Sequence, residues 1–337
     1  MAKRATLADV ARLAGLSPTT VSMVLNNRPN TRLSEEAAER VRAAAAQLNY
    51  RPNPAARGLR LGKTRTVGFI SDEVTITRYA SAMIRGLLEE AEKREHTVLI
   101  AESGRKVKRM AEALDAMLDR QTDGIVFGMQ AAKQIEVPKL SADVPVVLAN
   151  ATSTAGHPCV LPDEYRAGYD AVRYLTDRGH RRLALIGRSK DLLDVANSAT
   201  VANRYAGMDA ALAEAGLAFE FEVTAGKDWE PELGYQGAHQ ILSSASVTAV
   251  VAANDRVAFG VYQAAQERGL RVPEDLSVIS FDDEYLASYL RPGLTTMHIP
   301  YREMGRSAMS LVLDGDAPAK TLIPMPVRER GSVRTLD

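Results

Sequence analysis

The stretch TLADVARLAGLSPTTVSMVLN, residues 6–26, has the spacing of two short helices joined by a tight turn. If Leu7 is the first helical position, the apolar residues fall where the two helices must bury against each other. Ala11 permits close backbone approach, and Gly15 lies at the turn, where a positive φ is tolerated without a Cβ. The buried positions are Val10, Ala14, Leu16, Val21 and Val24. The stretch therefore predicts a helix-turn-helix of the kind that lies in DNA.

Local signals mark where these helices begin. Thr6 is the expected N-cap of the first helix, with Asp9 three residues on, and Ser17 is that of the second, with Pro18 at its first position. Residues 34–48, SEEAAERVRAAAAQL, open with a cap and two carboxylates and predict a third helix. An ordinary helical hairpin shares several of these features, so the spacing alone leaves that alternative open.

Further along, the chain resembles the lactose and galactose repressor (LacI/GalR) family of transcriptional regulators. The resemblance rests on the helix-turn-helix, on LNYRPN at 48–53 and on AARGLR at 55–60. It continues through RYAG at 204–207, VAAND at 251–255, VISFDD at 278–283 and LTT at 294–296. It implies an N-terminal all-α helix-turn-helix DNA-binding domain followed by an α/β core of two parallel-sheet subdomains, similar to periplasmic binding proteins.

Charge is unevenly distributed along the 337 residues. Residues 1–63 hold eleven Lys and Arg against four Asp and Glu, a net charge of +7. The remaining residues hold 31 against 38, a net of −7, so the whole chain is neutral. A basic end beside a helix-turn-helix is the end expected to meet DNA.

Several classes of protein are disfavoured by what the sequence lacks. Cys159 is the single cysteine, so no intrachain disulfide is expected, and no apolar run approaches the roughly 20 residues of a membrane span. The first ten residues have charge but no apolar core, unlike a signal peptide. We therefore expect a cytoplasmic protein with no membrane partner.

From residue 66 onward, short β-rich runs alternate with helical patterns, which is typical of parallel α/β sheets. The expected strands are 67–70, 98–100, 124–127, 144–148, 183–186, 249–252 and 276–281. The resemblance implies two subdomains joined by three crossings, near Leu161, Arg291 and Ile323. The expected domains are 1–50 for the helix-turn-helix, 51–63 for a hinge helix, 64–161 with 293–323 for the first subdomain, and 162–292 with 324–337 for the second.

Polar side chains follow several of the expected strands, where open α/β sheets bind ligands. Asp72, Glu73 and Asn150 follow strands of the first subdomain, and Asn254 and Asp282 follow strands of the second. The resemblance adds two residues to this effector site: Arg204 matches a ligand-binding arginine, and Trp229 matches an aromatic ring that packs against the effector. An aspartate after a strand can instead cap the next helix, and a lone tryptophan is often core.

Carboxylates, an amide, a guanidinium and an indole together suit a carbohydrate. We expect a repressor of carbohydrate uptake or catabolism genes that a small sugar, a mono- or oligosaccharide, releases from its operator. A purine or nucleoside effector is the alternative within the family. An enzyme acting on a sugar is a distant one, because no nucleophile motif accompanies the acids. The five histidines are widely spaced, so neither metal nor cofactor is expected.

The resemblance also implies how the second helix reads DNA. Pro18, Thr19 and Met23 lie where the family reads bases, and Met23 replaces a common arginine, which removes a bidentate donor to guanine. The polar side chains suited to phosphate contacts are those of Ser17, Thr20, Ser22 and Asn26. The other residues expected to bind DNA are Thr6 in the first domain and Asn53 and Ala56 in the hinge.

Leu59 is expected to wedge into the minor groove from a hinge helix that forms on the operator. The family implication is a homodimer on a pseudo-palindromic double-stranded operator, with effector binding weakening the paired hinge helices.

Overall fold

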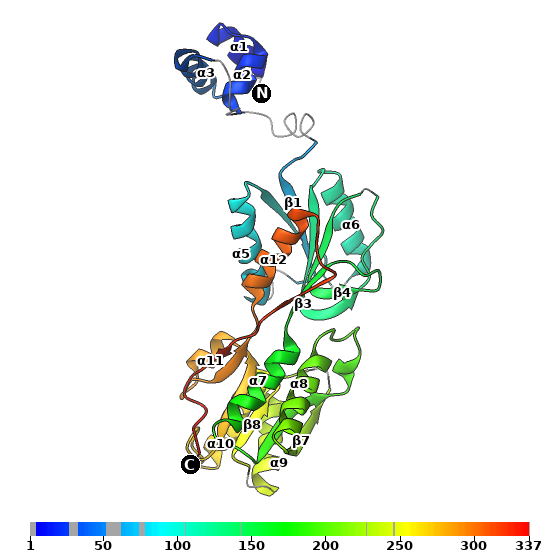
Figure 1. The fold of residues 1–337 in the computed structure, drawn as a ribbon, viewed down its shortest axis with the longest axis vertical. Coiled ribbons are helices and arrows are strands. Elements are labelled where there is room, and N and C mark those ends of the chain that lie inside the picture. Colours follow the sequence, from blue (N-terminus) through cyan, green and yellow to red (C-terminus); the bar gives the residue numbers. More distant parts are fainter. Residues whose placement is uncertain are drawn as a thin grey trace. The chain divides into compact units, whose positions relative to one another are not determined.

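The computed structural model describes residues 5–26, 33–51, 62–73, 78–104, 106–141, 143–226, 228–244 and 247–336. They belong to two compact units, Met1–Thr64 and Arg65–Asp337 (Figure 1). The three hinge residues expected to contact DNA, Asn53, Ala56 and Leu59, lie outside the described residues.

In its described residues, the first unit contains three helices that begin where the sequence places their caps. They are α1 (Leu7–Ala14), α2 (Pro18–Leu25) and α3 (Glu35–Gln47). Thr6 and Asp9 form a reciprocal capping box, and the Ser17 side chain accepts the N–H of Thr20. Gly15 ends α1 in the left-handed region with φ 68°. The predicted caps and turn are thus confirmed.

The three helices share one apolar core. Val10, Val21 and Val41 are fully buried where α1, α2 and α3 meet, and small alanines let the helices approach. The positions predicted to be buried in the helix-turn-helix, Val10, Ala14, Val21 and Val24, all lie in this core, and Leu16 packs against it. The helix-turn-helix prediction is confirmed.

The second unit contains two six-stranded sheets, each covered by helices on both faces. The first sheet has the order β11-β5-β4-β3-β1-β2 and is parallel throughout. Its strands are β1 (Thr66–Ser71), β2 (Thr97–Glu102), β3 (Gly124–Ile135), β4 (Val146–Ser153), β5 (Cys159–Pro162) and β11 (Lys320–Ile323).

Side chains of β1 point alternately to the two faces of this sheet. Val67 and Phe69 pack with α5 (Arg78–Lys93) and α12 (Tyr301–Asp314), whereas Ile70 packs with α6 (Val107–Leu118). Because both faces are covered, the strand is apolar almost without interruption, as expected for a parallel sheet.

The second sheet has the order β12-β10-β9-β8-β6-β7, and only its short edge strand β12 is antiparallel. Its strands are β6 (Leu183–Ser189), β7 (Phe219–Ala225), β8 (Ala249–Ala252), β9 (Ser277–Asp282), β10 (Thr295–His298) and β12 (Val327–Arg328). Helices α7 (Glu164–Thr176) and α8 (Val201–Glu214) pack on one face, and α9 (Pro231–Ser244) and α10 (Asp255–Glu267) on the other. Two short helices, η1 (Asp191–Leu193) and α11 (Tyr285–Tyr289), also belong to this subdomain.

One crossing between the sheets differs from the sequence-based expectation. The segment from residue 293 was assigned to the first subdomain, but β10 pairs in parallel with β9, so the chain enters the first subdomain only after His298. The reason is that Thr295 and Thr296 are fully buried beside β9, where Thr296 donates a hydrogen bond to Asp255. The other two crossings follow β5 and β11.

The strand β3 is also longer than expected. It was predicted to end near residue 127 but continues to Ile135, after a shift of register against β4 between Gly128 and Lys133. Its last part reaches the second subdomain, because Gln134 N–H donates to Val195 O at 2.8 Å and Ala199 N–H donates to Ala132 O at 2.8 Å. The two subdomains are therefore linked by backbone hydrogen bonds as well as by crossing strands.

Candidate functional site

The second helix of the first unit presents the side chains expected to meet DNA. Pro18 and Thr19 are exposed, Met23 is partly exposed, and the buried Val21 and Val24 face the bundle core. Among the residues expected to contact the backbone, the Ser17 and Thr20 hydroxyls lie 2.9 Å apart, and Asn26 donates to Ser22 O at 2.6 Å. These hydroxyl and amide groups are thus held in place before any DNA is bound.

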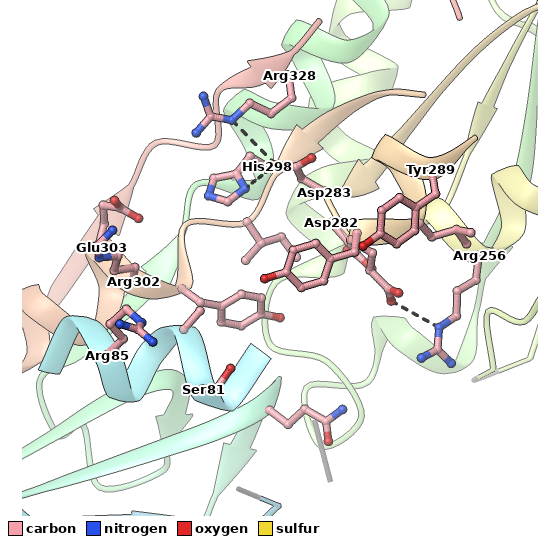
Figure 2. Close-up of a pocket in the computed structure, with 17 residues that line it drawn as sticks. Ser81, Arg85, Arg256, Asp282, Asp283, Tyr289, His298, Arg302, Glu303 and Arg328 are labelled. Atoms are coloured by element: carbon pink, nitrogen blue, oxygen red, sulfur yellow. Dashed lines mark hydrogen bonds and ion pairs between the residues drawn. The ribbon is translucent and has the colours of Figure 1, made fainter. Parts of the chain in front are cut away.

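In the second unit, a cavity of about 940 Å³ lies between the two subdomains. Ser81 and Arg85 of α5 lie on one side, with Arg256 and Tyr289 on the opposite side (Figure 2). A volume of this size is within the range of small-molecule sites. All seven predicted effector residues are described, and Asp282 is the one that lines this cavity.

Asp282 stands at the end of β9 in an uncommon backbone conformation, with φ 105°. Its carboxylate receives no hydrogen bond from another residue of the described part of the chain. Burial raises the pKa of Asp282 to about 8; the nearby Arg204 opposes the shift, and the carboxylates of Asp255 and Glu284 add to it. A strained, poorly solvated carboxyl at a strand end is typical of a functional site.

The next residue, Asp283, belongs to an ion-pair cluster at the crossing. It accepts hydrogen bonds from Arg330 at 2.6 Å and from His298 Nδ1 at 3.0 Å, and Arg328 lies 3.7 Å away (Figure 2). Burial alone would raise the pKa of Asp283, but these partners hold it below its ordinary value. The cluster ties β10 and β12 to the loop that carries Asp282.

Behind the Asp282 loop, Asp255 is fully buried at the start of α10. It accepts hydrogen bonds from the hydroxyls of Ser280 and Thr296 and from the Glu284 N–H. Burial raises its pKa to about 7, against the effect of these hydrogen bonds. Asn254, and not Asp255, caps α10, through the Val257 N–H at 2.8 Å.

Three predicted effector residues of the second subdomain lie together beside Asp282. Arg204 donates to Ala253 O at 2.7 Å, Asn254 donates to Trp229 O at 3.1 Å, and the Trp229 indole donates to Gly187 O at 2.9 Å. The guanidinium of Arg204 lies 5.4 Å from the centre of the Trp229 ring. Trp229 is partly exposed, so it is not a fully buried core residue.

The predicted effector residues of the first subdomain converge on β3. Asp72 accepts hydrogen bonds from Gln130 N–H at 3.1 Å and from Lys133 Nζ at 2.6 Å. Asn150, with φ 55°, donates to the carbonyls of Met129 and Gln130. Glu73 follows Asp72 and is partly exposed. Because Gln130 lines the cavity, this group reaches the cavity wall through β3.

Sequence reasoning missed one central residue, Glu164. Its carboxylate accepts hydrogen bonds from Arg204 Nε at 2.6 Å and Arg204 Nη2 at 2.8 Å, and both side chains are almost completely buried. Forty residues separate the two, and no short motif connects them. Only the packing of α7 against α8 brings them together.

Two further observations concern the described residues. Among them, no group of three His, Cys, Asp or Glu side chains is placed to hold a metal ion. In the same part of the chain, no helix is long and apolar enough to span a membrane.

A helix-turn-helix unit joined to a two-subdomain α/β core with a cavity between the subdomains defines a class: DNA-binding regulators with a ligand-binding core. Comparison with known proteins agrees. Residues 6–53 match the bacterial regulatory proteins of the lacI family, and residues 172–333 match the periplasmic binding protein-like domain.

Individual proteins give the same result. The chain is 33% identical to the HTH-type transcriptional repressor PurR of Erwinia tasmaniensis, over 92% of this chain and 90% of that protein. It is 32% identical to the ribose operon repressor of Haemophilus influenzae, over 92% and 91%. The lac repressor dimer bound to operator and the anti-inducer ONPF superposes with a TM-score of 0.77 at 26% identity, covering 98% of this chain and all of the other.

The chain belongs to the LacI family of bacterial transcriptional regulators. It is accordingly a DNA-binding regulator and not an enzyme, so the distant alternative of a sugar-acting enzyme is set aside.

Proposed function

We propose that this regulator represses genes of carbohydrate uptake or catabolism and that a small sugar releases it from its operator. The observation that carries the proposal is the cavity between the subdomains, which Asp282 lines. Arg204, Trp229 and Asn254 lie beside that carboxyl, and a carboxylate, a guanidinium and an amide are the groups that bind paired sugar hydroxyls. An indole suits the apolar face of a pyranose.

The mechanism we propose is a coupling between the cavity and DNA binding. The chain crosses between the subdomains beside the Asp283 cluster, so a ligand that draws the cavity walls together would shift the first subdomain, which directly follows the DNA-binding unit in the chain. A coupling free energy of about 1–3 kcal/mol corresponds to a 5- to 150-fold change in operator affinity.

Regulators of this fold bind two half-sites as a symmetric pair, and we propose a homodimer on a pseudo-palindromic operator. The proposed DNA contacts are those of the sequence analysis: Thr6, Ser17, Pro18, Thr19, Thr20, Ser22, Met23 and Asn26, with Asn53, Ala56 and Leu59 of the hinge. Sedimentation of the purified chain tests the dimer, and a monomer at micromolar concentration would contradict it.

A purine effector is the second candidate, because the PurR relative is as similar to this chain as the ribose operon repressor is. The two candidates separate in one experiment. The purified chain is screened by thermal shift against monosaccharides, disaccharides, polyols and purines, since a ligand that binds only the folded state raises the melting temperature. A sugar that raises the melting temperature supports the proposal. A response to purines alone would contradict the proposed sugar effector, although the chain would still be a DNA-binding regulator.

A further inference from the structure

The one arginine expected to bind the effector is already engaged within the protein. Two of the five N–H groups of Arg204 donate to Glu164 and a third donates to Ala253 O. The guanidinium also lies 4.1 Å from the centre of the Phe281 ring. Arg204 is 2% exposed and Glu164 is 4% exposed, so little water screens the pair. The remaining two N–H groups can still donate to a neutral oxygen.

This pairing is a product of the fold and not of one side-chain rotamer. Glu164 is in the first turn of α7, and Gly168 follows it by one turn. A Cβ on Gly168 would lie 2.1 Å from Arg204 O, and one on Gly207 would lie 2.0 Å from Tyr165 O. The two helices therefore approach backbone to backbone, and this contact fixes Glu164 against Arg204.

The charges beside the pair leave no surplus cation for an anionic ligand. Glu164 balances Arg204, and the next ionisable group toward the cavity is another carboxyl, Asp282. Burial and nearby carboxylates favour the neutral form of Asp282, which raises its pKa to about 8. A phosphate or carboxylate entering here would meet negative or neutral groups in a poorly solvated site, which is unfavourable.

Other arginines line the outer cavity, and most are paired with acids. Arg256 bonds with Glu230 and Glu284, Arg302 with Glu89, and Arg328 lies near Asp283. Arg85 lies on α5, on the wall opposite α11. Because these groups lie at the cavity wall, an anion bound anywhere in the cavity counts against a neutral ligand.

We infer that Glu164 determines the charge selectivity of the effector site: by occupying Arg204, it selects a neutral polyhydroxylated ligand over the phosphorylated or carboxylated counterpart. This inference rests on the proposed function and makes its ligand class narrower. Sugar phosphates and aldonates are therefore disfavoured as effectors, whereas the unmodified neutral sugar is favoured.

The test uses the full chain and matched ligand pairs by isothermal titration: glucose with glucose 6-phosphate and gluconate, ribose with ribose 5-phosphate, and the neutral disaccharides cellobiose and sucrose. For the wild type, we expect a neutral sugar to bind and the anionic counterpart of a binding monosaccharide to bind at least tenfold more weakly. In Glu164→Gln, which keeps an acceptor for Arg204 but removes the charge, this preference should shrink by at least tenfold.

A matched control is Asp209→Asn. It removes one carboxylate from the pair with Arg188, which is also on the α8 side of the second subdomain but does not line the cavity. Its ligand preference should equal that of the wild type. If Glu164→Gln does not fold, the wild-type comparison still tests the predicted preference, and equal binding of the neutral and the anionic sugar overturns the inference.

The outcomes are distinct. A wild-type chain that binds an anionic sugar as tightly as the neutral parent overturns the inference, whichever arginine holds it. An unchanged preference in Glu164→Gln also overturns it. If an anionic sugar binds at least as tightly as its neutral parent and releases the operator, the proposed function stands and this inference fails. If no sugar binds at all, both fail.

Discussion

At the level of single residues, two carboxyl groups of the core, those of Asp282 and Asp255, are poorly solvated, so their protonation is coupled to folding. The folded state raises the pKa of Asp282 to about 8 and that of Asp255 to about 7. A carboxyl whose pKa is raised by folding stabilises the protein fully only below its unfolded pKa. That contribution is lost as the pH rises through the folded pKa.

Asp282→Asn should therefore change how stability depends on pH. Between pH 5 and pH 8, the wild-type core should lose more stability than the variant, because the amide does not ionise. Asp255 contributes in the same direction to both proteins. Urea denaturation at several pH values measures the difference, and parallel curves for the two proteins would show that Asp282 is ionised in the folded core.

The buried Arg204–Glu164 pair leads to a second prediction. Arg204→Met leaves Glu164 buried without its partner and should cost about 3–5 kcal/mol of stability, whereas Glu164→Leu combined with Arg204→Met should recover most of the loss. Urea denaturation of the two single variants and the double variant gives the coupling. A double variant as unstable as the singles together would mean that the pair is not coupled.

At the scale of the element, what the sequence could predict depended on how local the signal was. The caps of α1 and α2 and the glycine turn depend on residues within one turn of each other, so they were predictable. The continuation of β3 depends on β4 and on a loop of the second subdomain, which no local pattern reveals. The same holds for β10, whose partner is decided by burial beside β9.

The close approach of α7 and α8 can be tested with one methyl group. Gly168→Ala places a Cβ 2.1 Å from a backbone oxygen that cannot rotate away, so it should cost about 1–3 kcal/mol or more. Gly226→Ala is the matched control, because its Cβ would meet only a side-chain oxygen at 3.8 Å. Thermal unfolding of both variants measures the effect. Equal melting temperatures would show that the helices can separate without cost.

The capping box of α1 allows a similar test in the DNA-binding unit. Thr6→Ala removes the side-chain acceptor for the Asp9 N–H and should destabilise α1 by about 1 kcal/mol. Amide hydrogen exchange in α1 of the full chain should then be faster by about fivefold. Thr19→Ala, an exposed threonine in α2, serves as the control and should leave exchange in α1 unchanged. Unaltered exchange in Thr6→Ala would contradict the capping assignment.

For the chain as a whole, the order of the domains was predictable from the sequence, but the side-chain contacts within the candidate site were not. The strand-end rule placed Asn254 and Asp282 near one another, because strand ends of a parallel sheet share an edge. Arg204, which lies on α8, was predicted only from the family resemblance. Glu164 was not predicted, because its contact with Arg204, forty positions away in the sequence, depends on the packing of two helices. Asp72 and Asn150 were found by the same strand-end rule, but their partners lie on a part of β3 that was not expected to be a strand.

In the mechanism we propose, a small molecule bound in the core controls DNA binding by the first unit. The most direct measurement is the affinity of the full chain for an operator duplex, selected from a random library, by fluorescence anisotropy with and without the sugar that raises the melting temperature. We predict a 5- to 150-fold loss of operator affinity at saturating sugar. Equal affinity with and without a sugar that demonstrably binds would contradict the claim.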